Sequence, residues 1–316
     1  MAETAKKKTA AAKPEKAEKA EKAEAAEATW KPTAEAKKKA TTFRVIAMIL
    51  WVVAIAGEAV GIFWLLRQRE LVSGSEGEGL RRDPETGLLT EGSDAVYEFP
   101  QWAFISLIVL LVVIAALSII GSILWKKANR LDPASKKDKV RFFVQNQLGA
   151  IIAIIAFVPL IILVFLNKDM SGAQKGIAGG LGIVLVLVAG YVGVDLNPPS
   201  VEKYTADQSA VIQLLGQDHV YWVAGGSVYH VCNEVSDIQN ASSEPGEGTT
   251  AEAVEAGKQR LTLELKSELT ACGLPVPENV SEITDALRTI QGGEEATPLP
   301  QPVYADGVTP PFTPAG

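Results

Sequence analysis

Apolar residues are concentrated in four long blocks of this chain, at 45–66, 102–125, 148–166 and 176–194, and polar residues fill the segments between them. Each block has about 20 residues, which as a helix is enough to cross the ~30 Å hydrocarbon core of a bilayer. Tryptophans at 51, 64, 102 and 125 lie in or beside these blocks, as is typical of rings at the headgroup level. The pattern predicts an all-α membrane protein whose four transmembrane helices form a domain over 43–194.

Lysine and arginine are distributed unevenly between the polar segments. Residues 1–44 contain 12 of them and residues 126–141 contain 7, whereas loop 67–101 contains 4 and loop 167–175 contains 2. Because cytoplasmic segments carry the excess of basic residues, the sequence predicts a multi-pass plasma-membrane protein with both termini in the cytoplasm. The loop 126–141 is then either a binding site for anionic lipid or a charge cluster that only sets the topology.

Both ends of the chain have compositions typical of disorder. Residues 1–42 are rich in lysine, alanine and glutamate, and residues 292–316 are rich in proline. Neither segment contains enough apolar surface to form a core, so both are predicted to be disordered tails. A nucleic-acid partner is not expected, because glutamates cancel most of the positive charge in the N-terminal repeats and no aromatic platform accompanies them.

Residues 195–291 have the pattern of a small cytoplasmic α+β module, a β-hairpin plus helices. Helical periodicity appears at 200–216, 249–273 and 278–291, and an alternating pattern runs over 219–235 on both sides of Gly225 and Gly226. A two-residue turn at these glycines gives a hairpin. That register pairs Tyr221 with His230 and also brings His219 opposite Cys232.

The predicted hairpin places His219, His230 and Cys232 on one face. Opposed residues have Cβ atoms about 5 Å apart, so two imidazoles and a thiol would form part of a zinc site. The fourth ligand would be Cys272 or an acid, and the chain contains no Cys-x-x-Cys pair. The alternative is an ordinary hairpin with a solvated polar face. A disulfide between Cys232 and Cys272 is not expected in the reducing cytoplasm.

Several stretches between residues 43 and 261 resemble a family of uncharacterised membrane proteins, largely from Gram-positive bacteria. They include KKANRLDPASKKDKVRFFVQNQLGAIIAIIAFVPLIIL, NPPSVEKYT, VYWVAGGSVYHV and EGTTAEAVEAGKQRL. The resemblance implies several transmembrane helices and a C-terminal module similar to the metal-binding fold of the Ada type. The positions that match the module's pattern are Val220, Tyr221, Trp222, Gly226, Tyr229 and His230.

The chain departs from this pattern where the pattern has metal ligands. Val235 stands at the cysteine position, and TLELKSEL (262–269) replaces a Cys-x-x-Cys pair. Cys232 is out of register with the pattern. The resemblance therefore implies a degenerate module with no cofactor, and zinc is kept as an alternative.

Glu58 is the one ionisable residue inside the four apolar blocks. A buried acid in a membrane helix indicates either a proton or cation relay, or a protonated side chain that hydrogen-bonds a neighbouring helix. Gly57 and Gly61 flank it with spacing that permits close helix packing. The pairs Gly176/Gly180 and Ala189/Gly193 repeat such spacing, and together they favour a compact bundle that could self-associate into a homo-oligomer.

The chain carries none of the common enzyme signatures, and it has two histidines in all, so an enzyme is not expected. The leading hypothesis is a binding, scaffolding or regulatory protein that engages an unknown protein partner through the cytoplasmic module. The alternatives are a small transporter or channel component that uses Glu58, and a membrane-tethered metal sensor.

Overall fold

The computed structural model describes residues 29–73, 80–82, 87, 89–91, 96–294 and 298–311. The chain divides into two compact units. Residues 41–127 and 143–196 form the membrane unit, and residues 1–40, 128–142 and 197–316 form the module unit. Each unit is described separately below.

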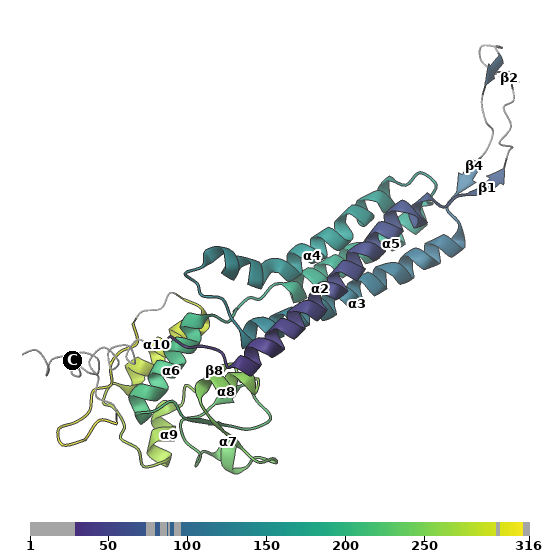
Figure 1. The fold of residues 1–316 in the computed structure, drawn as a ribbon. Coiled ribbons are helices and arrows are strands. Elements are labelled where there is room, and N and C mark those ends of the chain that lie inside the picture. The colour runs from purple at the N-terminus through teal and green to yellow at the C-terminus, as the bar shows by residue number, and fades with distance from the viewer. Residues whose placement is uncertain are drawn as a thin grey trace, which may run out of the picture. The chain divides into compact units, whose positions relative to one another are not determined.

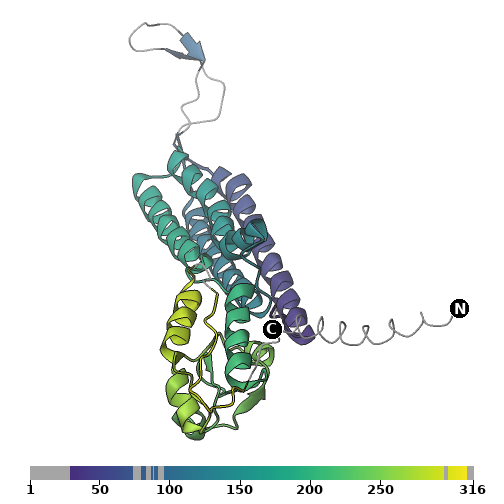
Figure 2. The ribbon, with the colours of Figure 1, turned by 90° about the vertical axis from the view of Figure 1, so that its left-hand side faces the viewer.

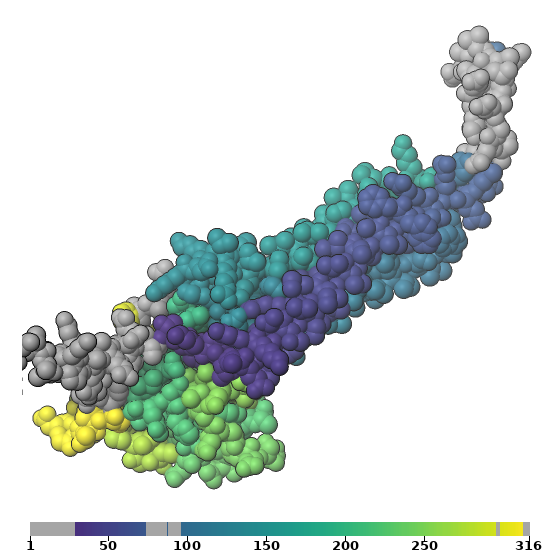
Figure 3. All heavy atoms as spheres, in the orientation of Figure 1, coloured from purple at the N-terminus to yellow at the C-terminus, as the bar shows by residue number. Residues whose placement is uncertain are grey.

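Four helices lie side by side in the membrane unit (Figures 1 and 2). They are α2 (Ala34–Phe63), α3 (Gln101–Leu131), α4 (Lys139–Leu166) and α5 (Gly172–Gly193), and α2 and α4 begin and α3 ends in the module unit. All four are long and apolar enough to cross a membrane. This confirms four helices at the four predicted blocks. Large apolar side chains such as Val52 and Leu187 are each 66% exposed, and the outer face of α2 (purple in Figure 3) carries several of them.

The interior of the membrane unit combines large apolar side chains with close contacts at glycines. Its core includes Leu107, Leu111, Phe157 and Leu160, which are at most 1% exposed. Small residues let membrane helices approach closely, and their packing replaces the hydrophobic effect that lipid cannot supply.

Only some of the predicted small-residue pairs are used for packing within the chain. An added Cβ at Gly61 would lie 3.1 Å from Leu110 and 3.2 Å from Leu160, and one at Gly193 would lie 2.4 Å from the Ala150 nitrogen. In contrast, an added Cβ at Gly176 or Gly180 would meet nothing within 4 Å. The predicted close packing therefore holds for Gly61 and Gly193, and the pair on α5 faces away from the described residues.

Four short strands lie in the segment between the C-terminus of α2 and the start of α3. A 3-10 turn, η1 (Leu65–Arg67), leads into β1 (Glu70–Ser73), which pairs antiparallel with β4 (Val96–Glu98). Between them, β2 (Leu80–Arg82) pairs antiparallel with β3 (Leu89–Glu91). The sequence pattern did not predict these strands, because they are only three or four residues long.

The module unit contains five helices and four short strands among its residues from 197 onward that the structure describes. The helices are α6 (Val201–Leu215), α7 (Ser236–Gln239), α8 (Thr250–Glu255), α9 (Leu265–Ala271) and α10 (Val280–Gly292). The strands are β5 (Val220–Trp222), β6 (Val228–Tyr229), β7 (Gly246–Gly248) and β8 (Arg260–Leu261). α6 begins at the N-cap Ser200 and ends at Gly216, as its sequence signals predict.

The predicted hairpin is only partly present. Tyr221 and His230 exchange backbone hydrogen bonds of 2.9 and 2.8 Å, as the predicted register requires. That pair is an isolated bridge, because β5 takes β7 as its antiparallel partner and β6 pairs with β8 in parallel. The hairpin prediction was therefore right for the Tyr221–His230 pair and wrong for the rest of the pairing between β5 and β6. The later strands β7 and β8 pair with β5 and β6 instead.

The predicted helix over 249–273 is two helices with a strand between them. α8 ends before Gly257, whose φ of +92° favours glycine, and β8 follows. The helical pattern was misread here because β8 is only two residues long and is held by long-range pairing with β6.

The N-terminal segment is partly ordered, in contrast to the predicted disordered tail over 1–42. Residues 1–28 lie outside the described residues, but α2 begins at Ala34 and Trp30 is only 2% exposed in the module core. Thr33 Oγ1 accepts a hydrogen bond from the Ala36 amide at the start of α2. One aromatic residue inserted into a distant core orders a segment whose composition is otherwise typical of disorder.

The proline-rich tail also differs from its prediction over 298–311. Val303 donates its amide to Asn279 Oδ1 at 2.9 Å and accepts from the Glu278 amide at 2.7 Å. Leu299 packs against the module core. Proline-rich chain can lie extended on a folded surface at low entropic cost, so its composition does not exclude order. Residues 295–297 and 312–316 lie outside the described residues.

Candidate functional site

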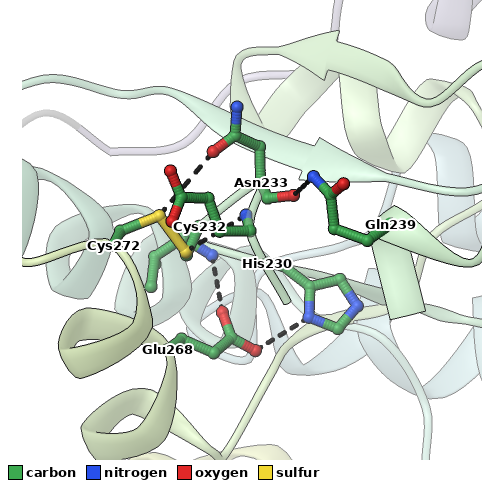
Figure 4. The surroundings of a disulfide bond; sticks show 8 residues. His230, Cys232, Asn233, Gln239, Glu268 and Cys272 are labelled. Atoms are coloured by element: carbon green, nitrogen blue, oxygen red, sulfur yellow. Dashed lines mark hydrogen bonds and ion pairs between the residues drawn. A yellow bond between two sulfur atoms is a disulfide. The ribbon is translucent and has the colours of Figure 1, made fainter. Parts of the chain in front are cut away.

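His230 and Glu268 form a buried pair next to a disulfide (Figure 4). His230 Nδ1 lies 2.8 Å from Glu268 Oε1, and their side chains are 8% and 4% exposed. The other carboxylate oxygen, Oε2, accepts the Val231 amide at 2.9 Å. An ionised carboxylate only accepts, so its contact with Nδ1 favours the imidazole tautomer that has its proton on Nδ1. The pair joins the segment after β6 to α9.

Cys232 and Cys272 form a disulfide, which contradicts the prediction that they would stay reduced. Their Cα atoms are 5.9 Å apart and their positions are 40 residues apart in sequence. Cys232 is fully buried, and Cys272 caps the C-terminus of α9. The prediction was wrong because it used only the expected compartment, whereas the His230–Glu268 contact and the packing of α9 bring the two thiols together.

The three predicted metal ligands have three different partners. His219 packs edge-on against Tyr221, with 4.9 Å between ring centroids, and its Nε2 lies 3.9 Å from Glu247. His230 pairs with Glu268, and Cys232 is bonded to Cys272. Among the residues that the structure describes, no group of three His, Cys, Asp or Glu side chains could hold a metal ion. The shared face is not formed because the ladder stops after Tyr221–His230.

A second buried polar cluster surrounds Asp207, which is 1% exposed. Its Oδ2 accepts from the Tyr229 hydroxyl at 2.9 Å and from the Leu261 amide at 2.8 Å. Its Oδ1 accepts from Gln291 Nε2 at 2.9 Å. Burial raises the pKa of Asp207 above its ordinary value, and these donors oppose that shift. The cluster ties α6, β6, β8 and α10 together, and sequence reasoning missed it because no local motif links its members.

Lys258 is buried beneath the loop that joins β5 to β6. Its Nζ donates to the backbone carbonyls of Val223 at 2.5 Å and Gly226 at 3.1 Å, and to the two carbonyls between them at 3.3 Å. Burial lowers the pKa of Lys258. The contacts explain how the turn at Gly225 and Gly226 keeps its shape without a regular hairpin. The lysine therefore has a structural role.

An open groove of about 790 Å³ runs between α9 and α10. Leu263, Ala271 and Val280 contribute apolar surface, and two acidic and two basic side chains lie along it. The charged residues are Glu264, Lys266, Asp285 and Arg288. The groove is thus close to neutral in net charge, and a segment with an apolar face would fit it. The sequence predicted the α10 wall as the helix at 278–291, but it did not predict the α9 wall as a separate helix, because it merged α9 with α8.

Glu58 lies in α2 and is 5% exposed. Its carboxyl group interacts with the backbone of Leu160 in α4, and its Oε1 has no hydrogen-bond partner among the described residues. This position is next to Pro159, whose ring lacks the amide that would bond the preceding turn. The arrangement is compatible with either role predicted for Glu58.

The basic loop 126–141 is partly used for internal contacts. Lys126 Nζ donates to the Val194 carbonyl at 2.6 Å in the membrane unit. In the module unit, Lys136 Nζ donates to the Gly293 carbonyl at 2.9 Å, and Arg141 lies 3.5 Å from Asp132. Lys137 and Lys139 are exposed. Any lipid contact by this loop would therefore involve only part of its predicted charge.

Searches against protein-family models, curated proteins and solved structures return no match to this chain. The resemblance to Gram-positive membrane proteins with an Ada-like module thus stays a prediction. The function must be argued from the geometry of the chain itself.

Proposed function

We propose that this chain is a membrane-anchored binding protein whose module unit engages a segment of a partner protein. The four apolar helices act as the anchor, and the observation that carries the proposal is the groove between α9 and α10. The groove lies over a completed core, since Leu265, Leu269 and Leu287 beneath it are fully buried. A partner segment would therefore bind to a surface that is already folded, and the core of the module unit does not need the partner for its completion.

The polar interior of the module unit supports a binding role over catalysis. Asp207, His230, Lys258 and Glu268 all use their side chains in internal hydrogen bonds. Groups committed in this way hold loops and strands in place, and they provide a rigid surface at low entropic cost for binding.

We place both termini in the cytoplasm of a plasma-membrane protein, on the strength of the basic residues at 1–44 and 126–141. In that compartment disulfides are usually transient or redox-sensing. The Cys232–Cys272 bond would then be reversible. Trapping thiols with an alkylating reagent in intact cells, before lysis, tests this placement.

Site-specific photo-crosslinking in native membranes tests the binding role. A photoreactive residue at Thr270, which lines the groove, should give a discrete adduct with one protein, whereas the same residue at the exposed Ser243 should not. Filling the groove with Ala271→Trp should abolish the adduct, and Ser243→Trp should leave it unchanged. Equal adducts at both positions, or an adduct insensitive to Ala271→Trp, would refute the proposal.

A second candidate function is proton or cation movement through the membrane unit. It is favoured by the buried Oε1 of Glu58, which has no hydrogen-bond partner in the described part of the chain. Glu58→Gln keeps the shape and removes the charge. It should abolish flux in proteoliposomes if this function is right, and Ser106→Ala at a partly exposed position of α3 serves as the control. No flux in the parent protein would eliminate this candidate.

A further inference from the structure

A small cavity of about 90 Å³ lies in the module unit, at the junction of the end of α3 with α6, β8 and α10. Three basic side chains contribute to its wall: Arg130 from α3, Lys203 from α6 and Arg260 from β8. One acid, Asp207, lines it as well. With a water molecule occupying ~30 Å³ in the liquid, the cavity has room for one small polyatomic anion and is too small for a nucleoside.

Arg260 interacts electrostatically with Asp207, but neither arginine contacts an acid directly among the described residues. Neither Arg130 nor Arg260 makes an ion pair or a side-chain hydrogen bond with any residue that the structure describes. The Arg130 carbonyl accepts a hydrogen bond from the Tyr204 hydroxyl at 3.2 Å, which holds this end of α3 beside α6. Lys203, which is 7% exposed and contacts Asn197, adds a third positive charge.

Asp207 does not supply the missing counter-charge by direct contact. Both of its oxygens already accept hydrogen bonds from Tyr229, Leu261 and Gln291. Burial raises the pKa of Asp207, and the charge of Arg260 is among the causes that oppose this shift. Three basic side chains thus face this single acid. The wall therefore carries an excess of positive charge around a space that a ligand can enter.

Gln291 adds a feature that narrows the class of anion. Its Nε2 donates to Asp207 Oδ1 and to the Leu261 carbonyl, which fixes the amide orientation. Its Oε1 is buried and has no hydrogen-bond partner among the described residues. A ligand that matches this wall has anionic oxygens for the guanidinium groups and one hydroxyl for the Gln291 oxygen.

We infer that the cavity bounded by Arg130, Lys203, Arg260 and Gln291 binds a phosphate group, carried either by a phosphomonoester lipid headgroup or by a soluble phosphate. Guanidinium groups match the tetrahedral oxygens of phosphate in two-point contacts. A singly protonated phosphate also has the hydroxyl that Gln291 Oε1 lacks. This inference does not depend on the α9–α10 groove or on its partner.

The test uses the full-length protein in nanodiscs of neutral lipid, titrated with inorganic phosphate by isothermal calorimetry. Saturable binding is expected, and Arg130→Gln/Arg260→Gln should weaken it about tenfold or more. The matched control, Lys137→Gln/Lys139→Gln, removes the same charge from exposed positions in the same region and should change the affinity less than about twofold. Arg130→Lys/Arg260→Lys, which keeps the charge, should show an intermediate loss, and thermal unfolding of each variant verifies its fold.

Nanodiscs that contain phosphatidic acid separate the two sources. If they prevent inorganic phosphate from binding in the parent protein, the group belongs to a lipid headgroup; if phosphate still binds, the ligand is soluble. Either result supports the site. The inference is overturned if the parent binds neither probe, or if Arg130→Gln/Arg260→Gln and the control Lys137→Gln/Lys139→Gln lose binding equally. It is also overturned if sulfate, which lacks a proton at neutral pH, binds as tightly as phosphate.

Discussion

Trp30 packs its indole against the ring of Tyr204, with 4.7 Å between the ring centroids, although 174 positions separate the two residues in the sequence. The Trp30 amide also donates to Thr205 Oγ1 at 3.1 Å. The segment before the first apolar helix is therefore part of the core that the C-terminal third of the chain builds.

Trp30→Ala should destabilise the module unit by about 3–5 kcal/mol, because it leaves a cavity in that core. Chemical unfolding of the full-length protein, followed by a signal from the module unit, would measure the loss. Lys31→Ala at the neighbouring exposed position is the control and should change the stability by less than about 0.5 kcal/mol. Similar losses in the two variants would contradict the packing described for Trp30.

The Cys232–Cys272 bond closes a loop of 40 residues, and its removal should cost about 2–4 kcal/mol. Cys232→Ala/Cys272→Ala should therefore unfold at a lower denaturant concentration than the oxidised parent. A reductant should lower the unfolding midpoint of the parent and leave that of the double variant unchanged. Alkylation in denaturant and without reductant, which exposes the buried Cys232, should label neither cysteine in the oxidised parent and should label Cys272 in Cys232→Ser. Labelling of both cysteines in the unreduced parent would show that the bond does not form.

Gly193→Ala should weaken the packing of α4 against α5, since the new Cβ would lie 2.4 Å from the Ala150 nitrogen and 2.5 Å from the Gly149 carbonyl carbon. Backbone atoms cannot move aside cheaply, so the expected cost is about 1–3 kcal/mol. The loss should appear as a lower temperature of unfolding in detergent.

Gly180→Ala is the matched control, because nothing lies within 4 Å of its added Cβ. It should leave the unfolding temperature unchanged. If Gly180→Ala instead lowered the oligomeric state in detergent, the open face of α5 would be a contact between copies. Equal destabilisation by the two substitutions would argue against the α4–α5 contact.

Glu255 should stabilise the module unit at neutral pH, and this contribution should be lost in acid. Its carboxylate accepts from Lys39 Nζ at 2.7 Å and from the Thr33 hydroxyl at 2.6 Å, and these bonds hold the pKa of Glu255 below its ordinary value. A lowered folded-state pKa contributes stability above the unfolded-state pKa of about 4.5, and that stability is lost as the pH falls through the folded-state value.

The parent should therefore unfold at a slightly higher temperature than Glu255→Gln at pH 7, and the two should converge below about pH 4. Because the Lys39 side chain is 47% exposed, the gap in unfolding temperature should be small and should narrow further in high salt. Glu234→Gln, an exposed acid without such contacts, should match the parent throughout. A gap that does not change with pH would exclude the charge of Glu255 as its cause.

The sequence predicted the membrane unit well because long, uniformly apolar blocks have few alternatives to a spanning helix. It also predicted the Tyr221–His230 pair, since two glycines set the turn and a period of two sets the faces. The ends of the chain were predicted less well. Trp30 and Leu299 are single apolar residues that pack in or against the module core from segments of otherwise low complexity. The composition of a whole segment does not reveal the effect of one such residue.

The candidate site was less predictable than the fold. His219, His230 and Cys232 were predicted to share one face as metal ligands, whereas their partners Glu247, Glu268 and Cys272 come from later segments. The Asp207 cluster and the Lys258 contacts with loop carbonyls also depend on long-range packing. No local spacing in the sequence encodes these neighbours.

The position of Trp30 also constrains the order in which the protein assembles. Trp30 precedes the first apolar helix and Tyr204 follows the fourth, so in a bilayer they can meet only if the chain between them crosses an even number of times. A nascent chain with one helix left outside the membrane would hold the two rings on opposite sides. Closure of this aromatic pair therefore requires an even number of crossings, and a chain with one or three crossings cannot complete the core of the module unit.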